Sequence, residues 1–93
     1  MNASDTVTIP PQVMSRQVGD ELVILDLESG TYYGLDLVGA RIWELLETGS
    51  NFREVCETLV AEFDASIETI RHDAAKLLDT LCERKLIVVT SGG

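Results

Sequence analysis

The sequence predicts an α+β domain in which a three-stranded antiparallel sheet precedes a three-helix bundle. Two observations carry this prediction. Short β-rich segments separated by glycine turns fill the first third of the chain, and apolar residues recur at helical spacing from residue 37 onward. The 93 residues are enough for one domain with a single core.

Three segments have the character of strands. VMSRQV (13–18) is expected to form a short edge strand, and Gly19-Asp20 a turn. ELVILDL (21–27) and TYYGLD (31–36) are expected to form a hairpin joined by residues 28–30, with Gly30 in the left-handed conformation that closes such loops.

The pairing expected for this hairpin places Leu27 opposite Thr31. Leu25 then faces Tyr33, Val23 faces Leu35, and these side chains share one face of the sheet. Tyr32, Gly34 and Asp36 are expected on the other face, beside Ile24 and Asp26.

Each expected helix has a start signal and an apolar stripe. Asp36 caps the first helix, Gly49 ends it, and Trp43, Leu45 and Leu46 are assigned to the core. Ser50 or Asn51 caps the second helix, and Ser66 starts the third. The further apolar positions of the second and third stripes are Val55, Cys56, Leu59, Val60, Phe63, Ile67, Ile70, Ala74, Leu77, Leu78, Leu81 and Cys82.

The ends of the chain are expected to lie outside this framework. Residues 1–11, which include Pro10-Pro11, are interpreted as a disordered segment, residues 12–90 as the folded domain, and residues 91–93 as a flexible tail. LIVVT (86–90) either adds a last strand or packs against the sheet. The longest apolar runs are too short to span a membrane, and the N-terminus lacks the features of a secretion signal, so a cytoplasmic location is expected.

The composition and net charge disfavour several classes of partner and of chemistry. The formal charge of −9 disfavours nucleic acid and anionic membranes, and favours a basic or partly basic peptide as partner. Helices beside a hairpin are also typical of winged helix-turn-helix DNA-binding regulators, but the charges of residues 66–85 sum to zero. Cys56 and Cys82 are interpreted as buried thiols. With one histidine and no glycine-rich phosphate loop, neither a metal site, a cofactor nor catalysis is expected.

Two features indicate a peptide-binding surface. TYYGLD carries no charge or proline before Asp36 to protect an exposed edge, and Gly34 permits close approach of another backbone. The alternative is that the tyrosines are ordinary strand aromatics. The third helix is apolar over a wide arc, so one side of it can line a groove in which Ala74 and Ala75 leave room for a ligand. The alternative is that it is simply the core helix of a small domain.

The stretch from strand to helix resembles the PqqD family. The resemblance covers about residues 12–88 and is most specific in the strand-turn-strand-helix signature, namely Leu25-Asp26, Gly30, Tyr32-Tyr33, Leu35, Gly39, Ile42-Trp43 and Leu45-Leu46. The family usually has asparagine where this chain has Asp36, and Asp36 is still expected to cap the first helix.

The resemblance implies a recognition element with a winged helix-turn-helix-like fold that binds the leader of a ribosomally made precursor peptide. Family members deliver the leader to a modifying enzyme, which is a radical S-adenosylmethionine enzyme in pyrroloquinoline quinone (PQQ) synthesis or a leader peptidase in lasso-peptide pathways. The leader adds as a strand to the third strand and packs on the third helix, here Thr31–Asp36 and about Ile67–Leu81.

The sequence therefore predicts a non-catalytic peptide chaperone, as a monomer or as a dimer formed through edge strands or strand swapping. A DNA-binding regulator and a scaffold that docks biosynthetic enzymes remain the alternatives. The residues expected to contact the peptide are Thr31, Tyr32, Tyr33, Gly34, Leu35, Arg71, Ala74, Ala75 and Leu78, with Arg71 placed to pair with a leader carboxylate.

Overall fold

The computed structural model describes residues 2–91. In chain order its elements are β1 (Thr6–Thr8), β2 (Val13–Val18), β3 (Glu21–Asp26), β4 (Tyr32–Leu35), α1 (Leu37–Glu47), α2 (Phe52–Phe63), α3 (Ile67–Glu83) and β5 (Val88–Thr90).

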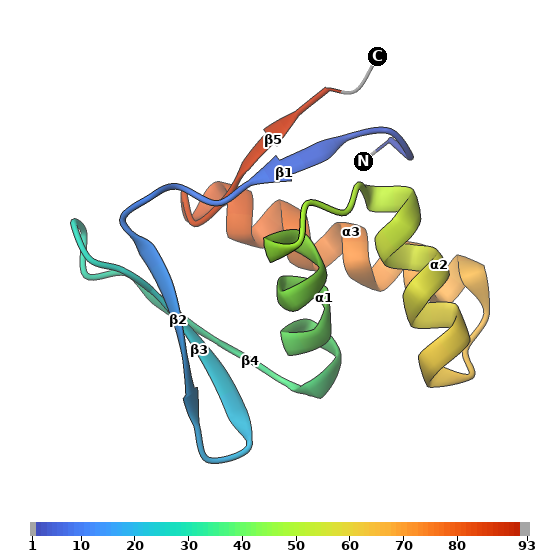
Figure 1. Cartoon of the computed structure of the whole chain (residues 1–93), viewed down its shortest axis with the longest axis horizontal. Helices are drawn as coiled ribbons and strands as arrows, with labels where there is room; N and C mark the ends of the chain where they lie inside the picture. The colour runs from blue at the N-terminus through green and yellow to red at the C-terminus, as the bar shows by residue number, and fades with distance from the viewer. Residues whose placement is uncertain (1, 92–93) are drawn as a thin grey trace.

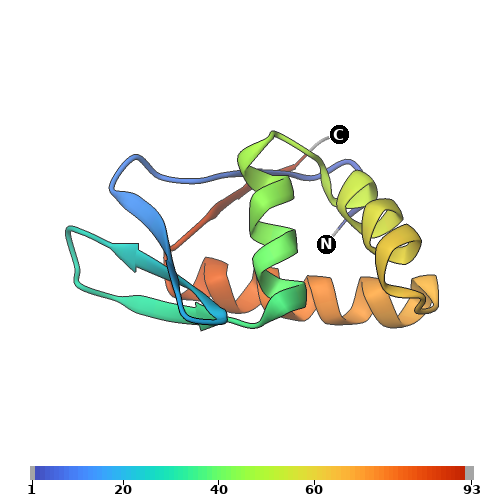
Figure 2. The same cartoon turned by 60° about the horizontal axis from the view of Figure 1, so that its bottom comes forward.

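The strands form two separate antiparallel sheets. One has the order β2-β3-β4, and the other pairs β1 with β5. Helix α1 lies between the three-stranded sheet and α2 (Figure 1), and α3 crosses beneath α1 (Figure 2). The predicted α+β class, with a three-stranded antiparallel sheet followed by three helices, is confirmed.

The β3–β4 hairpin has a different register from the one expected. Leu25 pairs with Tyr32 and Ile24 with Tyr33, one residue away from the expected pairing. The cause is a bulge at the loop. The Asp26 carbonyl accepts from the Gly30 N–H (2.8 Å) while the Asp26 N–H donates to the Thr31 carbonyl (2.8 Å), so two residues lie opposite one. Gly30 has φ +77°, as expected.

The side chain of Asp26 stabilises this loop. It is buried, and its Oδ1 accepts from the main-chain N–H groups of Glu28 (2.8 Å) and Ser29 (3.1 Å). These bonds favour the carboxylate, chiefly the bond from Ser29, and they hold the pKa of Asp26 below its ordinary value. Leu27 is left in the loop with 62% of its surface exposed, and Thr31 bonds to Asp26 in its place.

The slip exchanges the two faces of the hairpin, because side chains alternate along a strand. Ile24 and Leu35 are buried on the core side, with Tyr33 half-buried beside them. Val23 and Leu25, which were expected with Tyr33 and Leu35, instead share the outer face with Tyr32 and Gly34.

Strand β4 passes into α1 without a spacer. Asp36 caps the helix as expected, since its Oδ1 accepts from the Gly39 N–H at 2.8 Å. Gly39 is buried against the end of the strand, and a Cβ at this position would lie 3.2 Å from Leu35 Cδ2. The absence of a side chain therefore lets α1 begin directly against β4.

The three helices each begin at a capping residue, and together they enclose the core. Asn51 and Glu54 form a reciprocal capping box at α2, and Ser66 caps α3. Arg41 Nε donates to Glu62 Oε1 at 2.8 Å and joins α1 to α2. The largest fully buried side chains are Trp43, Ile24, Leu59, Leu78, Leu81, Leu86, Ile87, Val55 and Cys56.

The disorder expected for residues 1–11 is corrected for the part of this segment that the structure describes, residues 2–11, which contains the paired strand β1. Residues 6–8 pair with residues 88–90, and the Asp5 carbonyl accepts from the Phe52 N–H (3.1 Å) at the start of α2. Partners 80 or more residues apart leave no local signal in the sequence. The segment 86–90 accordingly ends in a strand paired with β1. Of the expected tail 91–93, only Ser91 lies within the described residues.

Cysteine burial differs from the expectation at one position. Cys56 is buried, but Cys82 is exposed, because it follows the core position Leu81 on the solvent side of α3. In residues 2–91 no helix is long and apolar enough to cross a membrane, and no cluster of metal-ligating side chains is present.

Candidate functional site

Within residues 2–91, strand β4 has an open edge. It is the last strand of its sheet, since β5 pairs with β1 and not with β4. Because Asp26 bonds to Thr31, and antiparallel bonding alternates, Tyr33 and Leu35 direct their N–H and C=O groups toward β3. Tyr32 and Gly34 therefore direct theirs away from the sheet, where an extended chain can bond to them.

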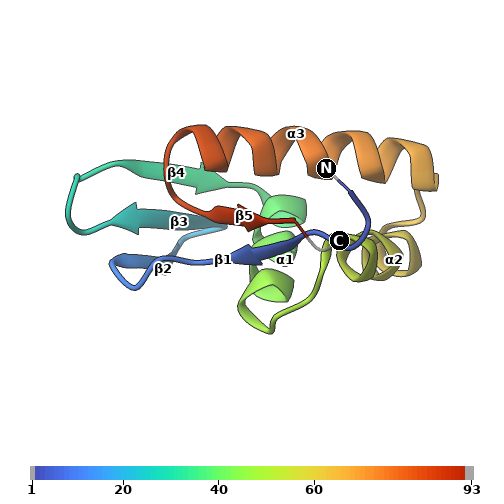
Figure 3. The same cartoon turned by 90° about the horizontal axis from the view of Figure 1, so that it is seen from above.

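A groove of about 540 Å³ lies beside this edge. Its walls are β4, the start of α1 and one side of α3, and Figure 3 shows α3 running alongside β4. We call this the β4–α3 groove. Its lining residues are Glu21, Tyr33, Gly34, Leu35, Asp36, Val38, Gly39, Ile42, Asp73, Lys76, Leu77 and Thr80.

The strand residues expected at the site lie at or next to the groove. Tyr33, Gly34 and Leu35 line it, although the Leu35 side chain is only 2% exposed and packs mainly into the core. Tyr32 is 70% exposed on the outer face of the sheet. Thr31 lies at the bulge, where its N–H donates to Ser29 Oγ.

The helix residues expected at the site are placed differently. Ala74 and Leu78 are 1% and 0% exposed, so their side chains belong to the core and do not line the groove. Ala75 is half-buried and also lies outside the lining. Asp73, Lys76, Leu77 and Thr80 supply the helical wall instead. These four residues lie on one side of α3, next to the side that faces the core. Because the apolar residues of α3 cover a wide arc, the sequence pattern did not separate the two sides.

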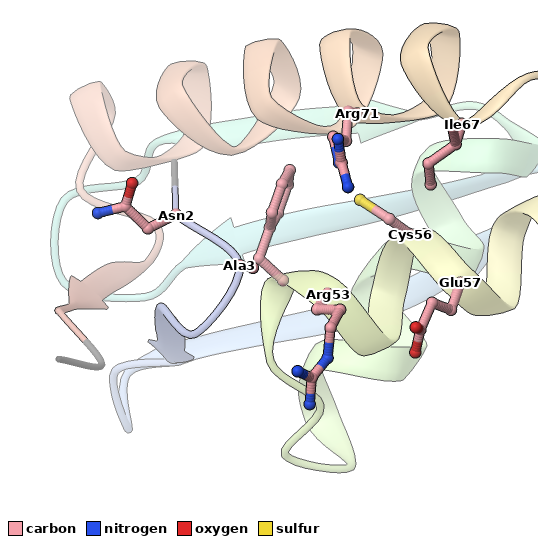
Figure 4. A pocket seen from close by; sticks show the side chains of 8 residues that line it. Asn2, Ala3, Arg53, Cys56, Glu57, Ile67 and Arg71 are labelled. Carbon is pink, nitrogen blue, oxygen red and sulfur yellow. The ribbon is translucent and has the colours of Figure 1, made fainter.

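Arg71 lies in a second hollow, away from β4. This hollow, of about 470 Å³, is formed by the N-terminal segment, α2 and the start of α3. Arg71 points toward Cys56 in it, and Arg53 points outward (Figure 4). Burial raises the pKa of the Cys56 thiol, more than the nearby Arg71 lowers it, so the thiol stays protonated and poorly reactive.

A different arginine stands next to β4. The Arg84 guanidinium, just after α3, lies 5.3 Å from the centroid of the Tyr33 ring, within the range of a cation–π contact. It holds the ring at the end of the groove where β4 begins.

The sequence from Glu21 to Ile87, about three quarters of the chain, matches the family model described as coenzyme PQQ synthesis protein D (PqqD). The chain belongs to the PqqD family. The matched region contains β3, β4 and all three helices, and thus every residue that lines the β4–α3 groove. A search of curated proteins found no significant match.

Solved structures share the PqqD fold of this chain. One is TbiB1 in complex with the TbiA(beta) leader peptide, which is 39% identical, has a TM-score of 0.79, and aligns over 85% of this chain and 92% of TbiB1. Another is a lasso peptide synthetase B1 complexed with the leader peptide, at 25% identity and a TM-score of 0.78, over 88% of this chain and 96% of that chain.

Proposed function

We propose that this PqqD protein is a non-catalytic recognition element that binds the leader of a ribosomally made precursor peptide. The leader adds as a strand to the open edge of β4 and places side chains in the β4–α3 groove. The observation that carries the proposal is the combination of an unpaired strand edge and an adjacent groove. Two similar proteins whose structures contain leader peptides support it.

The energetics require both parts of this surface. Tyr32 and Gly34 offer two donors and two acceptors at the edge, and at roughly 1 kcal/mol net each they supply about 4 kcal/mol. Micromolar binding needs about 8 kcal/mol, before the cost of ordering the leader is counted. Burial of about 160 Å² of apolar leader surface would supply the other 4 kcal/mol. The Leu77, Val38 and Ile42 side chains offer a wall of this character.

The partner that receives the bound leader is a modifying enzyme, either a radical S-adenosylmethionine enzyme or a leader peptidase. Because the leader belongs to a newly synthesised precursor, the proposed function places the protein in the cytoplasm. A pull-down on an immobilised modifying enzyme with labelled leader distinguishes delivery from simple docking, since delivery requires the enzyme to retain more leader when this protein is present.

Amide exchange by NMR tests the binding mode. The titrant is a synthetic leader peptide, for which the TbiA(beta) leader bound by the similar protein TbiB1 is the first choice. We expect the outward-facing amides of Tyr32 and Gly34 to become protected. Ser15 and Gln17, which occupy the outward-facing positions of β2 at the opposite edge of the sheet, serve as the internal control and should not change. Protection at β2, or shifts confined to the second hollow around Arg71, would overturn the proposal.

A further inference from the structure

The β4–α3 groove has two electrostatically different ends, and the inference drawn from this rests on the proposed leader binding. Helix α3 runs antiparallel to β4, so the C-terminal end of α3 lies beside the start of β4 (Figure 3). Arg84 marks that end, through its contact with the Tyr33 ring. Asp73, about 16 Å earlier along the helix axis, lies toward the end where β4 passes into α1.

Carboxylates gather at this second end. Glu21 Oε2 lies 3.1 Å from the position that a Cβ on Gly34 would take, so its carboxylate covers the strand where the side chain is missing. Glu21 and Asp73 are both exposed, and within residues 2–91 neither side chain makes a hydrogen bond or an ion pair. The Asp36 carboxylate, which caps α1, adds to the negative potential. Lys76 is the one basic side chain among the lining residues that the structure describes.

We propose that the acidic end of the groove, formed by Glu21 and Asp73, selects a lysine or arginine side chain of the leader and thereby fixes the direction of the leader strand on β4. Main-chain bonding alone allows an added strand to run either way along an edge. A cation near Glu21 and Asp73 is attracted, whereas the same cation at the opposite end meets Arg84. Complementary charge of this kind sets register and orientation more than it sets total affinity.

The expected effect is modest because both carboxylates are exposed. An exposed ion pair changes an equilibrium constant by up to about fivefold. The net charge of −9 attracts any basic peptide, so the experiment has to separate the contribution of these two carboxylates from that of the overall charge.

The experiment uses the full chain and a display library of random 12-residue peptides. Selected peptides are measured by fluorescence polarisation against the wild type and against Glu21→Gln/Asp73→Asn. The matched control is Asp79→Asn/Glu83→Gln, which removes the same charge from exposed positions of α3 outside the groove. We expect lysine or arginine at a constant distance from an apolar residue, about fivefold weaker binding by the first variant, and a clearly smaller loss in the control, which reports the contribution of the overall charge.

The direction of the strand is read separately. A spin label placed on the peptide next to its basic residue should broaden the amide signals around Asp36 and leave those around Thr31 sharp. Peptides that bind without a charge preference, or equal losses in both double variants, would overturn the selectivity and leave leader binding intact. Failure to enrich any peptide would overturn both proposals.

Discussion

Replacement of Gly34 by proline removes one main-chain donor from the open edge of β4. The Gly34 N–H points away from β3, so the β3–β4 ladder loses no bond. Proline is tolerated at an outward-facing position of an edge strand, and Tyr33 before it already has the extended conformation that proline requires. The fold should therefore survive while the binding edge is damaged.

The size of the effect follows from one lost hydrogen bond. The leader carbonyl that faces residue 34 would be left without its donor inside the complex. Such an unsatisfied group costs about 1–3 kcal/mol. This corresponds to leader binding that is roughly 5- to 150-fold weaker.

Calorimetry with the leader measures this change, and circular dichroism verifies the fold. The matched control is Gln17→Pro, which removes an outward donor from β2 at the other edge of the same sheet. It should bind the leader like the wild type. If Gly34→Pro binds normally, the leader does not pair with β4. If only Gln17→Pro loses binding, the leader pairs with β2 and not with β4, and the proposed site is wrong.

Four further variants test stability and the groove. The N–H of Ser29 lowers the pKa of Asp26, so the Asp26 carboxylate stabilises the fold fully above pH 3.8, and this stabilisation is lost as the pH falls through the folded-state pKa. In urea unfolding, Asp26→Asn should therefore lose less stability in acid than the wild type. An identical dependence of stability on pH in the two proteins would contradict this assignment. Gly39→Ala should lower the free energy of unfolding by about 1 kcal/mol, because crowding against β4 outweighs the gain in helix propensity. A variant that is more stable in thermal melts would show that β4 and α1 can move apart to accept the methyl group. Leu78→Ala should cost about 2–5 kcal/mol in denaturant unfolding. Leu77→Ala should change stability little and weaken leader binding by calorimetry, and the reverse result would invert our assignment of the α3 faces.

The order of the elements could be read from the sequence because each signal is local. The caps at Asp36, Asn51 and Ser66, and the left-handed Gly30, depend on residues within a few positions of each other. Each of these signals appears in the structure where the sequence analysis allowed it.

The features that the sequence did not reveal depend on competition or on distant partners. Leu27 has the hydrophobicity of a strand residue, but the bonds that Asp26 makes to Glu28 and Ser29 close the loop just after the strand, and the register is shifted by one residue. On α3, Leu77 and Leu78 are equally apolar, and the packing of α1 and α2 decides which of them is buried. The pairing of β1 with β5 depends on residues that are adjacent only after folding. The strand that borders the groove could therefore be predicted from the sequence, and the residues of α3 that line the groove could not.

The pairing of Thr6 with Thr90 brings the two ends of the folded chain to one place. A linker attached to either end would leave the domain from the same point. An enzyme fused before or after the domain would therefore lie at a similar distance from β4. The same closeness makes the domain suitable for circular permutation, with new termini in the turn at Gly19, where the chain is exposed and does not border the core.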